Sequence, residues 1–188
     1  MELVSEAIIF AVHAHDGMRR KKSESPYILH PMEAAVIVST MTDDQEVIAA
    51  AALHDVVEDA GITIEEVEEK FGKRVRELVE AETEDKREEV PPSESWYIRK
   101  EESLEILKNT NDMDVLIVWI GDKLANMRSL YREWKISGDK MWERFNQKDP
   151  KMQAWYYCSI AELTIKLSDT PAWIEYKALT DIVFKKGN

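Results

Sequence analysis

The feature that most constrains the fold is a charged hexapeptide that directly follows an apolar run. Residues 54–59 read His-Asp-Val-Val-Glu-Asp and carry four ionisable side chains, and residues 48–53 before them are apolar. Burying such groups costs free energy unless their charge is compensated. A divalent metal ion is an economical compensation, because imidazole nitrogen and carboxylate oxygen together suit a transition-metal ion. The hexapeptide therefore predicts a helix that ends at a metal site.

Two residues elsewhere could complete the ligand set. His30 lies between two nearby prolines, and Asp122 follows an apolar run, so the candidate ligands are His30, His54, Asp55 and Asp122. Adjacent residues point about 100° apart on a regular helix, so His54 and Asp55 can share one ion only near a helix end. Two nitrogen and two oxygen ligands suit Mn²⁺, Fe²⁺ or Zn²⁺. Taken singly, each residue could instead be a turn histidine or a capping aspartate.

A pair of carboxylates follows the candidate ligands directly. Glu58 and Asp59 lie on the next turn of the chain after Asp55. A metal ion lowers the pKa of bound water, and a nearby carboxylate can orient that water or accept its proton. Neighbouring like charges also raise one carboxyl pKa, which lets that group donate a proton. We therefore predict Glu58 and Asp59 as general acid and base, with an exposed acidic helix end as the alternative.

Helical periodicity dominates the rest of the chain. Thr63 and Glu66 have the spacing of a capping box, and Thr42 or Asp43 is expected to cap the helix that begins at residue 45. No alternating pattern requires a sheet, and residues 84–95 are expected to form a long loop. The predicted fold is an all-α, compact orthogonal helical bundle. Helices are expected over residues 3–16, 31–38, 45–55, 64–71, 73–82, 96–107, 113–132, 151–167 and 171–184.

Length, charge and cysteine content limit the class of protein. The 188 residues predict a single domain, with the core motifs in 1–132 and C-terminal helices over 138–186 packing on it. No apolar run is long enough to span a membrane, and the N-terminus lacks a signal-peptide pattern. The single cysteine, Cys158, fits a reducing compartment, so a cytoplasmic protein is expected. A net charge of −12 argues against a nucleic-acid polymer as partner.

One basic run interrupts this acidic composition. Residues 19–22 read Arg-Arg-Lys-Lys and come shortly before His30. Beside a candidate metal site, such a run suggests a small anionic ligand, and a solvated loop is the alternative. Asn126 shares a helix face with Asp122 at a spacing of four residues. Its amide could hydrogen-bond a ligand hydroxyl or phosphate, or it could cap a neighbouring loop.

Four segments resemble a known family. They are residues 20–31, 52–59, 71–79 and 121–128, and they contain the motifs Tyr-x-x-His-Pro, His-Asp-x-x-Glu-Asp, Phe-Gly and Gly-Asp-Lys-Leu-Ala-Asn-Met-Arg. In these segments the chain is similar to the hydrolase-type HD domain of the RelA/SpoT homologues. The similarity is greatest to the small stand-alone alarmone hydrolases, which include the metazoan SpoT homologue.

The resemblance implies an HD-domain bundle with one Mn²⁺, or another divalent metal, on the four candidate ligands. It implies that Glu58 and Asp59 position the attacking water. It also implies that Arg20 and Lys21 contact the guanine nucleotide and that Asn126 contacts a ribose or phosphate group. The implied reaction is hydrolysis of (p)ppGpp to pyrophosphate and GDP or GTP, which belongs to the stringent response.

Two alternative functions stay open. The first is another HD-type nucleotide phosphohydrolase on the same site, such as a 5′-nucleotidase or an NADPH 2′-phosphatase. The second is a nucleotide-sensing HD module with little turnover, which the presence of both Glu58 and Asp59 disfavours. The chain departs from many relatives in the loop 21–25 and at Ala125 and Ser129. These departures bear on base and phosphate specificity, and the sequence indicates no oligomeric state.

Overall fold

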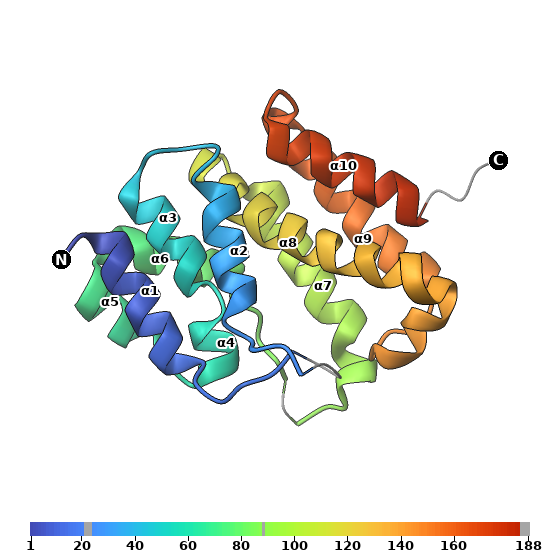
Figure 1. Ribbon diagram of the computed structural model, residues 1–188, viewed down its shortest axis with the longest axis horizontal. Helices are drawn as coiled ribbons and strands as arrows, with labels where there is room; N and C mark the ends of the chain where they lie inside the picture. The colour runs from blue at the N-terminus through green and yellow to red at the C-terminus, as the bar shows by residue number, and fades with distance from the viewer. Residues whose placement is uncertain (21–23, 88, 185–188) are drawn as a thin grey trace.

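The computed structural model describes residues 1–20, 24–87 and 89–184, and its regular structure is helical (Figure 1). Within these residues there is no β-strand, and only Arg19 and Pro26 form an isolated antiparallel bridge. The predicted all-α class is thus confirmed. No helix in the described part of the chain has the length and apolarity needed to cross a membrane. The elements are α1 (Leu3–Ala14), α2 (Leu29–Val38), α3 (Gln45–Leu53), α4 (Val56–Ala60), α5 (Ile64–Phe71), α6 (Lys73–Glu82), α7 (Pro92–Asn109), α8 (Met113–Ser137), the 3-10 helix η1 (Gly138–Arg144), α9 (Pro150–Leu163), the 3-10 helix η2 (Ile165–Leu167) and α10 (Pro171–Phe184).

Helix α8 forms the centre of the molecule. It packs against α2, α3, α6 and α10, and Figure 1 shows it running between the N-terminal helices and the C-terminal pair. Its apolar face is buried, as its helical spacing predicts: Leu116, Ile120, Leu124, Met127 and Leu130 are each at most 4% exposed. Each such side chain stabilises the fold by about 1.5–3 kcal/mol relative to an exposed one. The N-terminal and C-terminal helices therefore share one core around α8.

A glycine allows α2 and α8 to approach closely. A Cβ atom on Gly121 would lie 2.5 Å from Val38 Cγ2 and 3.1 Å from the carbonyl oxygen of Ala34. A larger residue at this position would therefore push the two helices apart. His30 lies in the first turn of α2, and Asp122 follows Gly121 on α8. The close contact between the helices brings these two candidate ligands together.

The helix predicted over residues 45–55 is shorter than expected. α3 ends at Leu53, and His54 and Asp55 occupy the turn before α4. The break lets two adjacent side chains point to the same place, which a continuous helix would prevent. The predicted cap at Thr42 or Asp43 is wrong. Asp44 caps α3 by accepting a hydrogen bond of 2.8 Å from the Glu46 N–H.

Other boundaries shift by a few residues. The capping box at Thr63 is confirmed. α2 begins before Pro31, because Leu29 and His30 already form the turn that starts the helix. α7 begins at Pro92 inside the predicted loop, since proline is well tolerated in a first helical turn. α8 runs past residue 132 to Ser137, and α9 ends at Leu163, where η2 takes over from the α-helix.

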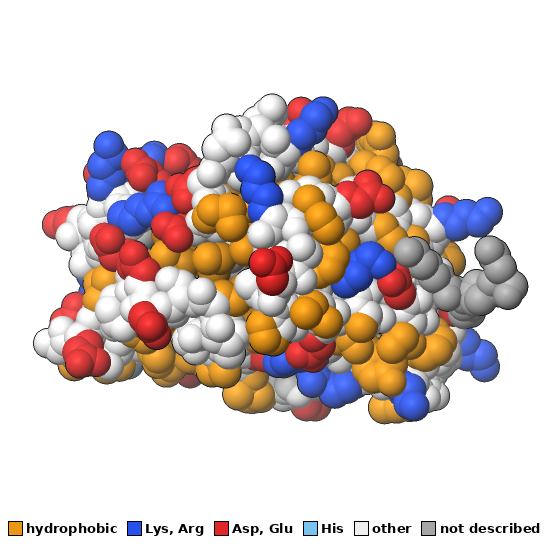
Figure 2. Space-filling model, turned by 90° about the horizontal axis from the view of Figure 1, so that it is seen from above, with side chains coloured by type: hydrophobic (Ala, Val, Ile, Leu, Met, Phe, Trp, Pro, Cys, Tyr) orange, Lys and Arg blue, Asp and Glu red, His pale blue; other side chains and the backbone are white. Residues whose placement is uncertain are grey.

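The surface mixes charged and apolar side chains. Figure 2 shows acidic, basic and hydrophobic groups interspersed over the face seen from above. On this face the net negative charge is spread out rather than gathered into one patch. Figure 2 therefore gives no reason to expect a nucleic-acid groove there.

Candidate metal centre

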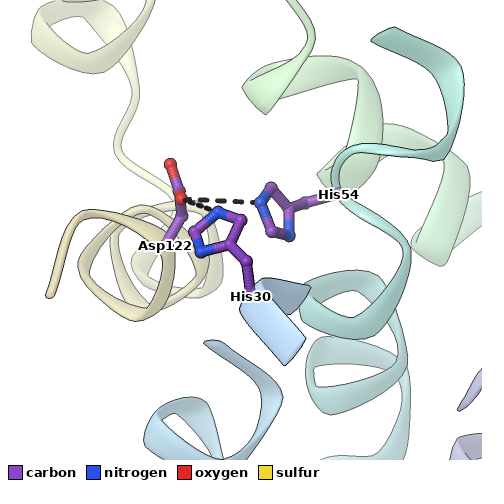
Figure 3. A group of neighbouring side chains, drawn as sticks. All are labelled: His30, His54 and Asp122. Carbon is purple, nitrogen blue, oxygen red and sulfur yellow. Dashed lines mark ion pairs between the residues drawn. The ribbon is translucent and has the colours of Figure 1, made fainter. Parts of the chain in front are cut away.

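Three separate elements bring the predicted ligands together. His30 comes from α2, His54 from the turn between α3 and α4, and Asp122 from α8 (Figure 3). Asp55 follows His54 in the same turn. His30, His54 and Asp122 are buried, and one ligand atom of each lies within 4.8 Å of the others. Figure 3 shows the two imidazole rings directed toward the Asp122 carboxylate.

The Nε2 nitrogen of each of the two histidines faces two carboxylate oxygens. His30 Nε2 lies 2.8 Å from Asp122 Oδ1, and His54 Nε2 lies 3.0 Å from Asp55 Oδ2. The two cross distances, from His30 to Asp55 and from His54 to Asp122, are both 3.5 Å. Asp55 Oδ2 thus lies beside both histidines, but among the described residues the group whose ligand atoms all lie within 4.8 Å of one another is His30, His54 and Asp122, without Asp55.

The tautomer of His54 tests whether this set suits a cation. His54 Nδ1 lies 2.8 Å from the Ala51 carbonyl oxygen, and a carbonyl can only accept, so Nδ1 carries the hydrogen. In the neutral ring Nε2 is then an acceptor that faces two carboxylate oxygens. Nε2 finds no hydrogen-bond donor among the described residues. A bound cation would interact favourably with both Nε2 and the carboxylate oxygens. A backbone partner on the other ring nitrogen is also typical of metal-binding histidines.

The pKa shifts within the cluster also indicate a site that suits a cation. Burial alone would lower the pKa of His54, but Asp55 and Asp122 raise it well above its ordinary value. Burial would raise the pKa of Asp55, but His54 and His30 bring it below its usual range. The site therefore attracts positive charge, which a proton on His54 supplies when no metal does. Because a metal ion competes with that proton, metal binding should release it.

Asp122 has a second partner that the sequence did not reveal. Lys123 Nζ contacts Asp122 Oδ2 and lies 2.8 Å from Glu82 Oε1 on α6. Burial would lower the pKa of Lys123, but these two carboxylates raise it well above its usual value. Burial raises the pKa of Glu82 to about 8. Lys123 holds one oxygen of Asp122 and leaves the other facing the histidines. Nothing marked Glu82 in advance among the many charged residues of α6.

The two predicted catalytic carboxylates have different surroundings. Asp59 Oδ1 lies 2.5 Å from Lys86 Nζ, and its Oδ2 accepts a hydrogen bond of 2.5 Å from the Tyr27 hydroxyl. Among the described residues, Glu58 accepts only a long hydrogen bond of 3.5 Å, from the Glu84 N–H. Burial and nearby carboxylates raise the pKa of Glu58 to about 7. Glu58 is thus suited to proton transfer near neutral pH, whereas both oxygens of Asp59 are already engaged.

Two of the three predicted nucleotide contacts lie beside the cluster. Arg20 donates a hydrogen bond of 3.1 Å to Asn126 Oδ1, and Asn126 donates one of 2.7 Å to Asp122 Oδ1. This chain of hydrogen bonds connects the basic run to a candidate ligand. Lys21, the third predicted contact, lies outside the described residues. Tyr27 was not predicted as a site residue, although it belongs to the Tyr-x-x-His-Pro motif.

Comparison with known proteins places the chain in a family. The family model described as HD domain matches residues 7–144, a span that contains all four candidate ligands. The guanosine-3′,5′-bis(diphosphate) 3′-pyrophosphohydrolase of Aquifex aeolicus is 35% identical over 130 residues, which are 69% of this chain and 18% of the relative. The chain spans less than a fifth of the length of the curated relatives that it matches.

Two solved structures share the architecture. The structure of lmo0812 from Listeria monocytogenes EGD-e is 28% identical, with a TM-score of 0.73, and the match covers 84% of this chain and 99% of that one. A structure described as a metazoan orthologue of SpoT that hydrolyses ppGpp is 24% identical, with a TM-score of 0.71, covering 99% and 96%. The chain therefore belongs to the HD domain family.

Proposed function

We propose that this protein hydrolyses the 3′-diphosphate of (p)ppGpp and releases pyrophosphate and GDP or GTP. One observation carries the proposal: each of two imidazole nitrogens lies within 3.5 Å of two carboxylate oxygens, next to a glutamate suited to proton transfer. The name of the Aquifex relative supports the choice of substrate. So do Arg20 and Lys86, two cations at the edge of the cluster that would attract a polyphosphate.

The proposal includes one divalent cation, Mn²⁺, held by His30, His54, Asp55 and Asp122. The mixed nitrogen and oxygen donors suit this ion. When bound, the cation would act as a Lewis acid that withdraws charge from water and from the phosphoryl group. Lys123 would keep Asp122 oriented, and the Ala51 carbonyl would keep His54 in the tautomer that presents Nε2.

Glu58 would move the proton. A water molecule attacks the phosphorus atom bonded to the ribose 3′ oxygen, and the Glu58 carboxylate accepts a proton from that water. The bond between phosphorus and the 3′ oxygen breaks, and pyrophosphate leaves. Glu58 then returns the proton to the 3′ oxygen, which becomes the hydroxyl of GDP or GTP. A pKa of about 7 lets one group take both roles near neutral pH.

Arg20 and Asn126 would hold the nucleotide on the other side of the cluster. Their mutual hydrogen bond keeps both polar groups beside Asp122, where ribose and phosphate oxygens could replace it. The proposed partner is a small nucleotide rather than a nucleic-acid polymer. The cytoplasm, where such nucleotides occur, is the proposed location.

A nucleotide panel tests the proposal. The purified protein with Mn²⁺ should release pyrophosphate from ppGpp and pppGpp, and removal of the metal with a chelator should abolish this activity. The panel should include adenine analogues, NADPH and nucleoside monophosphates. Preferential release of orthophosphate from NADPH or a monophosphate would favour the alternative phosphohydrolases. Metal-dependent nucleotide binding without turnover would favour a sensing module.

A further inference from the structure

Tyr27 lies between the candidate metal ligands and the catalytic carboxylates. Its hydroxyl is 2.8 Å from Asp55 Oδ2 and 2.5 Å from Asp59 Oδ2. Asp55 is a candidate ligand, and Asp59 belongs to the carboxylate pair on α4. Among the described residues, this single phenol is thus in contact with both parts of the site.

A phenol has one hydrogen to donate, and here two carboxylate oxygens compete for it. A phenol keeps its hydrogen near neutral pH, because its ordinary pKa is about 10. Only one of the two oxygens can receive that hydrogen in a well-aligned bond at any time. The hydroxyl can therefore respond to a change on either carboxylate.

The two oxygens differ in their other neighbours. Asp55 Oδ2 is the oxygen that lies 3.0 Å from His54 Nε2 and 3.5 Å from His30 Nε2, so it belongs to the ligand set. A cation held by that set withdraws electron density from this oxygen and makes it a weaker hydrogen-bond acceptor. Asp59 is not a candidate metal ligand, and its Oδ1 contacts Lys86 instead. With the cation present, the Tyr27 hydrogen is better placed on Asp59.

Two neighbouring side chains contact the ring of Tyr27. The His15 ring packs against it, with ring centroids 5.0 Å apart, and the Arg20 guanidinium carbon lies 5.5 Å from its centroid. His15 is 3% exposed, and neither of its ring nitrogens has a hydrogen-bond partner among the described residues. Burial lowers the pKa of His15, so it packs as a neutral ring. The phenol is therefore held in place by packing and can turn its hydroxyl hydrogen without moving the ring.

We propose that Tyr27 is a positioning residue whose hydroxyl hydrogen shifts from Asp55 to Asp59 when the cluster takes up its cation. Asp59, held by Tyr27 and Lys86, then stays a fixed acceptor that orients the attacking water. Glu58 is left as the carboxylate that exchanges a proton. The catalytic part of this inference rests on the proposed function, but the metal response of Tyr27 does not.

The first test is metal binding without substrate. Adding Mn²⁺ to the metal-free wild-type protein should change its near-ultraviolet difference spectrum, because the hydrogen bond of one phenol changes. Tyr27→Phe should bind Mn²⁺ in calorimetry yet lack that spectral component. Tyr97→Phe is the matched control, since Tyr97 is 44% exposed and its hydroxyl bonds Glu101 instead of the cluster. This control should retain the component.

The second test is turnover. Removal of a hydrogen bond to a charged group is expected to slow the reaction by about 10- to 100-fold. Tyr27→Phe should therefore lower kcat by this factor, with KM changed less than about threefold. A merely structural role would change thermal stability and leave kcat of the folded fraction unaltered. Wild-type kcat in Tyr27→Phe, or a metal-induced spectrum identical in both proteins, would overturn the proposal. If Tyr27→Phe does not fold, the wild-type protein alone provides the test. A flat difference spectrum on saturation with Mn²⁺ would then overturn the proposal.

Discussion

His30, His54 and Asp122 lie in the core, at most 7% exposed, whereas Arg19 and Pro26 on the loop before α2 are exposed. Three of the candidate ligands are held by a further polar contact: His54 by the Ala51 carbonyl, Asp55 by Tyr27 and Asp122 by Lys123. On the proposed nucleotide side, the Arg20 guanidinium donates one side-chain hydrogen bond among the described residues, to Asn126. The metal side is thus built in advance, while the nucleotide side can exchange its contacts for those of a ligand. This difference predicts distinct kinetic results for mutations on the two sides.

The largest effect is expected on the metal side. Asp55→Ala removes a charged ligand, so the purified variant should contain no Mn²⁺. Because the metal contributes several kcal/mol to the transition state, turnover should fall by about 10³-fold or more. Metal analysis and pyrophosphate release measure the two effects. Asp43→Ala, an exposed aspartate before α3, is the control. Full Mn²⁺ content in Asp55→Ala would remove Asp55 from the ligand set.

Glu58→Ala should separate metal binding from proton transfer. Glu58 is not one of the candidate metal ligands, so the Mn²⁺ content of the variant should stay at the wild-type level. Turnover should fall by about 10²- to 10⁴-fold, the usual contribution of general acid–base catalysis. Glu69→Ala on the exposed face of α5 serves as the matched substitution and should change neither quantity. Normal turnover in Glu58→Ala would show that another group moves the proton.

The same glutamate should affect stability in a pH-dependent way. Its pKa rises from 4.5 to about 7 on folding, so ionising it costs folding free energy. Wild-type protein therefore loses stability as the pH rises from 4.5 to about 7, and the full cost remains at higher pH. Glu58→Gln lacks this cost and should be more stable by about 3 kcal/mol at alkaline pH, with no gain well below pH 4.5. Urea denaturation of the metal-free proteins measures both values, and an equal gain at both extremes would contradict the assignment to ionisation.

The smallest effect is expected on the nucleotide side. Arg20→Ala should raise KM by about 10-fold, since it removes one charged contact to the substrate, and should change kcat little. Mn²⁺ affinity should stay the same. Arg19→Ala is the matched control, because Arg19 is the exposed neighbour in the same basic run. If Arg20→Ala instead lowered kcat with KM unchanged, Arg20 would belong with the catalytic groups, and the contrast between the two sides would fail.

Local sequence patterns predicted most of the fold. The capping box at Thr63, the buried face of α8 and the all-α class depend on residues three or four apart, so they can be found without the tertiary structure. The errors lie at helix ends. The pair Pro91-Pro92 suggested a loop, yet Pro92 starts α7, and α3 stops early where the chain turns at His54 and Asp55.

By itself, the sequence determined which residues could form the site. A charged hexapeptide after an apolar run, with one histidine before it and one aspartate after it, was enough to select four candidate ligands and two carboxylates. Only the tertiary structure decided how they meet. Gly121 lets α2 and α8 approach, Lys123 pairs with Glu82, and Tyr27 bridges Asp55 and Asp59. The residues in each of these contacts are at least 28 positions apart in the sequence. Helical periodicity carries no information about such separations.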